Sequence, residues 1–479
     1  MKTAVLPEEE FLYQQISESF EKQIMSELLK AGDKLPSVRA LSREQGISIS
    51  TAYLAYVQLE TKGLIEARPR SGYYVRFSPR LLPEQPSPVE RKKQPSATSV
   101  EEMIAQIYEN MSDEEIMRFS LAAPPVELLP AAKLSKTMAE AIRRSSNSCL
   151  AYEDIAGNLQ LRKQVARQAR SWGGNIRPDD VVITQGCMEA LVFALKTVTQ
   201  PGDIVAIQSP TYFGIFNVMR SLGLHALEIP QHPETGPDLE YLEKATGKIS
   251  VSAVLFVTNF NNPDGATMPD ERKKQLVQLL EKKDIPLIED DIYGELYFGK
   301  KRPLTCKHFD RKGNVLLCSS VSKTLAPGYR VGWCLPGRFR EKVMRVKLMH
   351  SISSASPTQA AIGLFFEAGR FDLHMRHLRK ALHVQCLRYT QAVAGYFPEG
   401  TKISRPVGGY VLWIELPGKI NAFELYQAAM LHKISIAPGQ IFSVHASHSQ
   451  FIRVSFGMPW TPAIDKSLRI LGNLAKGLL

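Results

Sequence analysis

Apolar and polar residues are arranged in three different ways along the chain. Within residues 1–77, apolar positions recur at helical spacing and are followed by two short runs, "LIEA" and "GYYVRF", that are typical of strands. Residues 78–115 begin with "SPRLLPEQPSPVERKKQPSATS", whose proline, serine and charge are typical of an extended linker. Over residues 116–479, short apolar runs alternate with longer helix candidates. We therefore expect two folded domains joined by a linker, in which "VEEMIAQIYENM" is either a docking helix or part of the linker.

The third region predicts a parallel sheet. Its strand candidates are "DVVIT" (180–184), "IVAIQ" (204–208), "SAVLFVT" (252–258), "PLIED" (286–290) and "NVLLCS" (314–319). Short apolar strands that alternate with helices are typical of an α/β domain, in which helices cover both faces of the sheet. The predicted fold class is therefore α/β for this region, preceded by a smaller helical domain with a strand pair.

Composition narrows the class of protein. A chain of 479 residues is too long for one ordinary domain, and 44% hydrophobic with 22% charged residues is typical of a soluble globular protein. No apolar run approaches the ~20 residues of a membrane span, and "MKTAVLPEEEF" turns acidic too early for a secretory signal. The six cysteines form no CxxC pair, which suits free thiols in a reducing cytoplasm. We expect a cytoplasmic protein without a metal site or a membrane partner.

Two short predicted helices form a helix-turn-helix. Ser37 is a good N-cap for the first helix, which ends at Gly46. Ser48 has the same role for "ISTAYLAYVQLETK", which ends at Gly63. Because a turn of three to four residues separates the helices, the second one is the candidate reader of a DNA major groove.

A basic tip joins the two strand candidates that follow. Arg68 and Arg70 in "RPRSG" could reach a minor groove or phosphates, which is the layout of a wing. The net charge of +11 is unevenly spread, and residues 30–80 carry nine basic against four acidic residues. A basic face is compatible with phosphate contacts, although net charge alone is no evidence for them. The alternative is a small helical packing domain with a hairpin.

This stretch resembles the winged helix of the GntR family of bacterial regulators. The resemblance rests on "LYQQI", "GDKLPSVRAL", "GISIST" and "YVQLETKGLIEARPRSGYYV". It implies double-stranded DNA as a partner, contacted through Arg39, Ser48, Ser50, Thr51, Tyr53, Arg68, Arg70 and Gly72. Members of the family often place an arginine directly after the serine that opens the recognition helix, where this chain has Ile49. We therefore expect base reading to depend on Tyr53, Arg39 or the wing.

One lysine of the large domain has surroundings suited to a phosphorylated aldehyde cofactor. Lys323 lies in "SSVSKTLAPGYR", close to Ser320 and Ser322 and seven residues before Arg330. Hydroxyls and an arginine are donors that a phosphate needs, and burial beside cations lowers the pKa of a lysine, as imine formation requires. A lysine beside serines is by itself more often a surface residue. The other parts of a pyridoxal phosphate site therefore decide the question.

Candidates for those parts follow several predicted strands. Asp290 ends "PLIED", where a pyridinium N–H would partner a carboxylate that is otherwise costly to bury. Asn262 in "TNFNNPDG" and Tyr293 can both reach the phenolic oxygen of such a cofactor. A helix start after "VVITQG" offers backbone N–H groups to a phosphate, from Gly186, Cys187 and Met188. The alternatives are solvated acids at a strand end and an ordinary Asn-Pro turn.

Two further side chains complete the candidate set. Tyr212 in "QSPTYFG" is a candidate to stack on the cofactor ring, with simple packing as the alternative. Arg453 lies on the otherwise apolar strand "FIRVSFG". A buried arginine needs an anion, and a ligand carboxylate fits its fork, whereas an internal salt bridge is the alternative.

These motifs together resemble the fold-type I aminotransferases over residues 116–479. The matching stretches are "YEDIAGNLQLRKQVA", "TNFNNPDG", "EDDIYGEL", "SSVSKTLAPGYRVGW", "RPVGGYVLWIELP" and "IRVSFG". The resemblance implies a large α/β domain with a mostly parallel sheet, a smaller C-terminal α/β subdomain, and pyridoxal 5'-phosphate as the cofactor. Asp264 stands where the family usually has a threonine, and Cys187 and Met188 replace more polar residues.

The same resemblance implies a role for each candidate residue. Lys323 would hold the cofactor aldehyde, and Asp290 would face the pyridinium nitrogen. Asn262 and Tyr293 would bind the phenolic oxygen, Tyr212 would cover the ring, and Arg453 would bind the ligand carboxylate. The phosphate would be held by Gly186, Cys187, Met188, Ser320, Ser322 and Arg330. Tyr152 matches a tyrosine that reaches the phosphate of the neighbouring subunit, which implies a homodimer with shared sites.

A winged helix, a proline-rich linker and an aminotransferase-like domain together resemble the MocR subfamily of GntR regulators. This resemblance implies a transcriptional regulator in which an amino-acid or amine effector displaces Lys323, forms an aldimine with pyridoxal phosphate, and modulates operator binding or transcription. The alternative is an active aminotransferase, from amino acid to 2-oxo acid, with an accessory DNA-binding domain. The residues fit both functions, because sensing and transamination share their first step.

Overall fold

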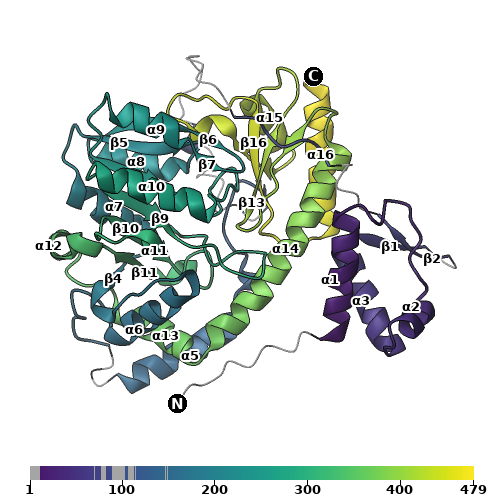
Figure 1. Ribbon diagram of the computed structural model, residues 1–479, viewed down its shortest axis with the longest axis horizontal. Coiled ribbons are helices and arrows are strands. Elements are labelled where there is room, and N and C mark those ends of the chain that lie inside the picture. Colours follow the sequence, from purple (N-terminus) through teal and green to yellow (C-terminus); the bar gives the residue numbers. More distant parts are fainter. Residues whose placement is uncertain are drawn as a thin grey trace.

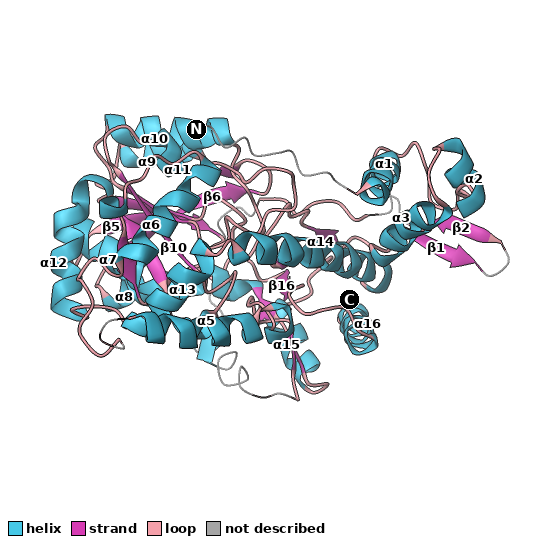
Figure 2. Ribbon diagram, turned by 90° about the horizontal axis from the view of Figure 1, so that it is seen from below, coloured by secondary structure: helices cyan, strands magenta, loops and turns pink. Residues whose placement is uncertain are grey.

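The computed structural model describes residues 11–68, 71–76, 82–88, 103–105, 113, 115–145, 147 and 149–479. Figure 1 shows a small N-terminal domain, in purple, beside a much larger body. Between them runs the long helix α14 (Arg370–Tyr396), and Figure 2 shows the same arrangement after a quarter turn. Most of the predicted linker, including most of "VEEMIAQIYENM", lies outside the described residues.

The N-terminal domain contains the predicted helix-turn-helix. Its elements are α1 (Leu12–Met25), α2 (Val38–Glu44), α3 (Ile49–Thr61), β1 (Ile65–Arg68) and β2 (Gly72–Val75). Ser37 Oγ accepts a hydrogen bond from Ala40 N at 3.1 Å, and Ser48 Oγ accepts one from Thr51 N at 3.0 Å. Both predicted N-caps are therefore confirmed, and they fix where α2 and α3 begin.

A small apolar core holds these elements together. Leu41 of α2, Tyr56 and Leu59 of α3, and Val75 of β2 are fully or almost fully buried in it. The hydroxyl of Tyr56 donates to Pro36 O at 2.7 Å, which satisfies the one polar atom that this ring carries inward. The hairpin is antiparallel, as the wing interpretation requires.

The large body is built on a central sheet of eight strands in the order β4-β11-β10-β9-β8-β5-β6-β7. The strands are β4 (Val182–Thr184), β5 (Ile204–Ser209), β6 (His225–His232), β7 (Gly236–Pro237), β8 (Ala253–Phe256), β9 (Leu287–Asp290), β10 (Val315–Ser320) and β11 (Gly332–Leu335). The neighbours from β10 through β6 pair in parallel, whereas β11 is antiparallel to β10 and β4, and β7 is antiparallel to β6. The predicted α/β class with a mostly parallel sheet is confirmed.

Alternate residues of the central strands enter two separate cores. On β8, Leu255 packs in the core that contains Leu191 of α7 (Cys187–Val198), whereas Val254 packs in the core that contains Leu276 of α10 (Asp270–Lys282). Both faces of the sheet are thus covered, which explains why its strands are apolar throughout. The other helices of this part are α5 (Ala131–Arg144), α6 (Leu159–Gln168), α8 (Phe213–Ser221), α9 (Leu239–Thr246), α11 (Cys306–Phe309), α12 (Arg340–His350) and α13 (Ser356–Glu367).

A second, antiparallel sheet of four strands follows α14 in the chain, in the order β12-β13-β16-β15. Its elements are β12 (Lys402–Ile403), β13 (Val411–Glu415), β15 (Ala437–Pro438) and β16 (Phe451–Ser455), accompanied by α15 (Ala422–Met430) and α16 (Pro462–Gly477). A separate parallel pair joins β14 (Ile434–Ser435) to β3 (Met117–Arg118). The segment that begins at β3 is therefore anchored on the C-terminal part, far away in sequence.

Two strand predictions were too long, for local reasons. In "DVVIT", Asp180 is part of a turn, because its carboxylate accepts from Arg177 N at 2.9 Å. In "SAVLFVT", Val257 lies beyond the end of β8, and both its N–H and its carbonyl bond the side chain of Gln208, at 2.7 and 3.0 Å. Within the described part of the chain, no helix is long and apolar enough to cross a membrane.

Candidate functional site

A cavity of about 250 Å³ lies where several parallel strands end and α7 begins. This edge of a parallel sheet is the usual position of a ligand site. The structure brings ten of the predicted residues to its wall: Cys187, Met188, Tyr212, Asn262, Asp290, Tyr293, Ser322, Lys323, Arg330 and Arg453.

Lys323 follows β10 and is half-buried at the cavity wall. Its Nζ donates a hydrogen bond of 2.5 Å to the carbonyl oxygen of Ala122. The backbone is held on both sides, since Tyr410 OH donates to Lys323 O at 2.7 Å and His374 Nε2 lies 2.7 Å from Thr324 O. Burial, and then the positive charge of Arg453, lower the pKa of Lys323 to about 8. A neutral, nucleophilic amine is thus available near neutral pH.

Asp290 is the last residue of β9 and is buried. Its Oδ1 accepts from Ile292 N at 3.1 Å and from Cys187 Sγ at 3.4 Å. Burial raises the pKa of this carboxyl group to about 6. A cationic N–H opposite the carboxylate would offset that cost and favour the ionised form.

Asn262 connects two other members of the set. Its Nδ2 lies 3.4 Å from the Tyr293 hydroxyl oxygen, and its Oδ1 accepts from Arg453 Nη1 at 2.9 Å. Burial raises the pKa of the Tyr293 phenol, so this hydroxyl keeps its proton and can donate it in a hydrogen bond.

Arg453 is buried on β16, and no carboxylate of the described residues pairs with it. Burial lowers its pKa to about 10. Its Nη2 donates to Ser120 O, its Nε has no hydrogen-bond partner among the described residues, and the Phe442 ring lies 5.3 Å from its guanidinium carbon. The internal salt bridge considered as an alternative is absent from the described part of the chain. A buried guanidinium held only by neutral oxygens still favours an anion.

The other end of the cavity is suited to a phosphate. Gly186 precedes α7 with φ of 84°, a conformation that favours glycine, and a Cβ there would come 2.4 Å from Arg330 Nη2 and displace this guanidinium. Arg330 donates to Ser322 Oγ at 3.3 Å and to Gln185 O at 3.2 Å. The guanidinium, the hydroxyl and the first N–H groups of α7 thus lie around one point. Ser320 does not line the cavity, and its Oγ instead accepts from Ser322 N at 3.2 Å.

Tyr152 lies elsewhere. Its side chain is 86% exposed, beside a separate pocket that also contains Cys149 and Glu153. Its predicted contact belongs to a neighbouring subunit and stays a prediction. Tyr212, just before α8, lines the candidate site, and its ring centroid lies 4.8 Å from that of Phe213; its stacking on a cofactor ring stays a prediction.

The donor set as a whole fits pyridoxal phosphate. A lysine with a lowered pKa, a carboxylate at a strand end, the polar side chains of Asn262 and Tyr293, and the start of α7 with Arg330 meet in one cavity. Sequence reasoning missed Ser120 and Ala122, whose backbone oxygens accept from Arg453 and Lys323. No side-chain pattern identifies a backbone acceptor, so the sequence offered no signal for them.

The residues predicted to face DNA lie on α2, α3 and the hairpin. Ser48 Oγ contacts Ser50 Oγ at 2.7 Å and Thr51 Oγ1 at 2.8 Å, so the three hydroxyls form one cluster at the start of α3. Ile49 and Tyr53, 57% and 52% exposed, lie on the same helix. Ile49 and Tyr53 are therefore accessible to a binding partner on this face of α3. Arg39 on α2 is exposed as well.

Arg68 makes contacts within the hairpin. Arg68 pairs with Glu66 at 2.8 Å, and its guanidinium lies 4.3 Å from the Tyr74 ring centre. Gly72 turns the chain into β2 with φ of 110°. Arg70 lies outside the described residues.

Comparison with known proteins agrees with the assignment of both the N-terminal domain and the large body. The family "Bacterial regulatory proteins, gntR family" matches residues 12–75, and "Aminotransferase class I and II" matches residues 115–461. Two Escherichia coli relatives named "Uncharacterized HTH-type transcriptional regulator", YdcR and YjiR, are 38% and 37% identical. Each match covers 96% of this chain and 98% of the relative.

A solved structure is similar to most of the chain. The kynurenine aminotransferase of Pyrococcus horikoshii, whose structure is a complex with PMP, is 26% identical with a TM-score of 0.73. The match covers 81% of this chain and 96% of that one.

Proposed function

The chain belongs to the aminotransferase class I and II family and, with its gntR-family domain, to the HTH-type transcriptional regulators of MocR-like architecture, and on this premise we propose a sensory function for the large domain. The large domain binds pyridoxal phosphate and an amino compound, and the N-terminal domain binds an operator. Binding of the amino compound to the large domain changes operator binding or transcription through the N-terminal domain. The observation that carries the proposal is the convergence of Lys323, Asp290 and Arg453 on one cavity of about 250 Å³.

The residues that would hold the cofactor follow from their positions. Arg330, Ser322 and the N–H groups at the start of α7 would bind its phosphate. Asp290 would face the ring nitrogen, with Asn262 and Tyr293 at the phenolic oxygen. When bound, the cofactor supplies an aldehyde carbon to which an amine bonds covalently. Lys323, neutral in part near pH 8, would be the amine of this chain that holds the cofactor.

Arg453 supports an effector that carries a carboxylate. Its guanidinium is buried, points at the cavity and has only neutral partners among the described residues. A carboxylate would give it a charge-assisted pair in a setting of low dielectric. An amino acid therefore fits between Lys323 and Arg453, with its amine toward the lysine and its carboxylate toward the arginine.

The N-terminal domain would bind double-stranded DNA through α3 and the hairpin. Two such domains on a homodimer, which the exposed position of Tyr152 allows, would gain affinity through their tether. The thiols of the chain suit a reducing cytoplasm, where an operator would be found.

A second candidate function is transamination. The kynurenine aminotransferase structure holds PMP, with KYN as substrates and KYA as products, and the similarity to it favours this function for the large domain. Both functions need the same residues, so only turnover separates them. Kinetics with an amino donor and a 2-oxo acid would show many cycles for a transaminase and at most about one for a sensor.

Genome-wide mapping of the bound DNA tests the regulatory function directly. We expect a small set of discrete sites whose neighbouring genes handle one class of amino compound. The absence of any enriched site, together with multiple turnovers in solution, would replace the proposal with the enzymatic alternative.

A further inference from the structure

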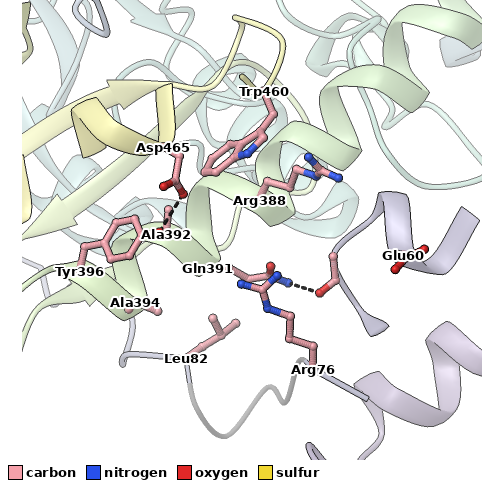
Figure 3. Close-up of a pocket in the computed structure, with 12 residues that line it drawn as sticks. Glu60, Arg76, Leu82, Arg388, Gln391, Ala392, Ala394, Tyr396, Trp460 and Asp465 are labelled. Atoms are coloured by element: carbon pink, nitrogen blue, oxygen red, sulfur yellow. Dashed lines mark hydrogen bonds between the residues drawn. The ribbon is translucent and has the colours of Figure 1, made fainter. Parts of the chain in front are cut away.

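A second cavity, of about 550 Å³, lies at the junction between the two folded parts. Figure 3 shows its walls: Glu60 and Arg76 come from the N-terminal domain, Arg388 and Gln391 from α14, and Trp460 from the segment before α16. Its volume is in the range of small-molecule pockets, which often occur between domains. No residue of the candidate cofactor site lines it.

Hydrogen bonds from α14 fix the geometry of this junction. Arg388 Nε donates to Thr61 O at 2.9 Å. Gln391 Nε2 donates to Gly63 O at 3.1 Å (Figure 3). Thr61 is the last residue of α3, where carbonyl groups lack intrahelical partners, and Gly63 follows the C-cap Lys62. The candidate recognition helix is therefore held by side chains of the large body.

Two arginines of like charge face this cavity from opposite sides. Arg388 is half-buried and donates to Thr61 through Nε, and within the described part of the chain its Nη1 and Nη2 make no hydrogen bond. Among the described residues, neither Arg388 nor Arg76 has a carboxylate within 4.0 Å. Burial, and then the charge of Arg76, lower the pKa of Arg388.

The two acids at the same cavity are already engaged. Glu60 Oε1 accepts from Ala67 N at 3.0 Å, which ties it to the hairpin. Asp465 accepts from Tyr396 OH at 2.7 Å and pairs with Arg469 at 3.2 Å. Among the residues that the structure describes, neither guanidinium group is in contact with a carboxylate, so an oxyanion between them would offset their mutual repulsion.

We propose that the junction cavity binds a small oxyanion with two or more oxygens, a phosphate or a dicarboxylate, that bridges Arg76 and Arg388. Such an anion would join the N-terminal domain to α14 and stabilise the docked position of α3. A ligand that binds one arrangement better shifts the equilibrium toward it, so the anion would act as a second effector. The binding site does not depend on the proposed function, whereas its effect on DNA binding rests on it.

Titration calorimetry on the full chain tests the site, with inorganic phosphate and with succinate as probes at constant ionic strength. We expect saturable binding of at least one probe, weakened by about tenfold or more in Arg388→Gln and in Arg76→Gln, the cost of one charge-assisted contact. Arg345→Gln is the matched control, because Arg345 is exposed on α12, away from the cavity. Binding of phosphate alone or of succinate alone identifies the source of the oxyanion.

The candidate cofactor site could also attract these probes, so Arg453→Gln and Arg330→Gln are titrated in parallel. Binding that survives both variants but not Arg388→Gln supports the junction site. Binding that is lost in Arg453→Gln or Arg330→Gln and kept in Arg388→Gln would overturn it, and so would the absence of saturable binding. Amide hydrogen exchange near Thr61 and Gly63 gives a readout of docking. We expect this exchange to slow when the probe is added to wild type, and to stay unchanged in Arg388→Gln.

Discussion

His374 lies with Nε2 2.7 Å from the carbonyl oxygen of Thr324, the residue that follows Lys323. The same helix, α14, bonds the end of α3 through Arg388 and Gln391. One rigid element thus contacts both the loop of the candidate lysine and the candidate recognition helix, about 21 Å apart along its axis.

We expect His374→Ala to weaken the coupling between the Lys323 loop and the candidate recognition helix α3. Burial lowers the pKa of His374, so the neutral ring donates to Thr324 O, and its loss should cost about 1 kcal/mol of folding free energy. The variant should keep covalent cofactor and operator affinity while its response to effector in a reporter assay falls. His377→Ala on the same helix is the control. An unchanged response in His374→Ala would remove this contact from the coupling.

Lys323→Ala should lose the covalent attachment of pyridoxal phosphate, because no other predicted site residue supplies an amine. Wild type should absorb in the visible range and yield a borohydride-reduced adduct on Lys323 by peptide mapping. The variant should still bind the operator, yet give no change in reporter output with effector. An adduct on another lysine, or a wild-type response in the variant, would contradict the assignment.

The rate of covalent capture at Lys323 should depend on pH. With a pKa of about 8, set mainly by burial and then by Arg453, the neutral amine should increase about tenfold per pH unit below 8 and level off above it. Stopped-flow absorbance with free pyridoxal phosphate measures this. Arg453→Gln removes a neighbouring cation and should move the midpoint to higher pH. A midpoint near 10.5 in wild type would show an ordinary lysine.

The same shift has a consequence for stability. The folded chain releases the Lys323 proton near pH 8 and the unfolded chain releases it near 10.5. Burial of the charged form therefore costs free energy below about pH 8, and this cost disappears as pH rises toward 10.5.

Arg453→Ala should weaken an amino-acid effector by about tenfold or more, since a buried charge-assisted contact is lost. Cofactor attachment should persist, because Arg453 contributes no predicted phosphate or ring contact. Spectral titration with the effector measures the affinity. An amine without a carboxylate serves as the control ligand and should bind both proteins alike. Equal affinities for the amino acid would exclude Arg453 from the site.

Arg39→Ala should weaken operator binding and reduce its salt dependence by about one phosphate contact, a slope change of roughly 0.9. The double change of Arg68 and Arg70 to alanine should have a larger effect of the same kind, partly because Arg68 also holds Tyr74. Fluorescence anisotropy at several salt concentrations measures both. The cofactor spectrum should stay unchanged in these variants. A normal salt slope would indicate that these residues do not contact phosphates.

Local signals explain what could be predicted. Ser37 and Ser48 cap helices that begin one residue later, so a few letters determine each start. Apart from Arg453, which lies within the antiparallel strand β16, the predicted cavity residues end strands or follow them, and parallel strands bring their carboxyl ends together. Contacts between distant segments had no such signal. The bonds from Arg388 and Gln391 to α3 each join residues more than 300 positions apart, and nothing in either segment indicates the other.

The carbonyl groups of Ser120 and Ala122 determine where the chain can be cut without damage to the cavity. They accept hydrogen bonds from Arg453 and Lys323, and β3, just before them, pairs with β14. Removal of the N-terminal domain by proteolysis or by gene truncation is therefore harmless to the cavity only when the cut falls ahead of Met117. A cut a few residues later would strip two acceptors from the cavity wall and release the edge of β14.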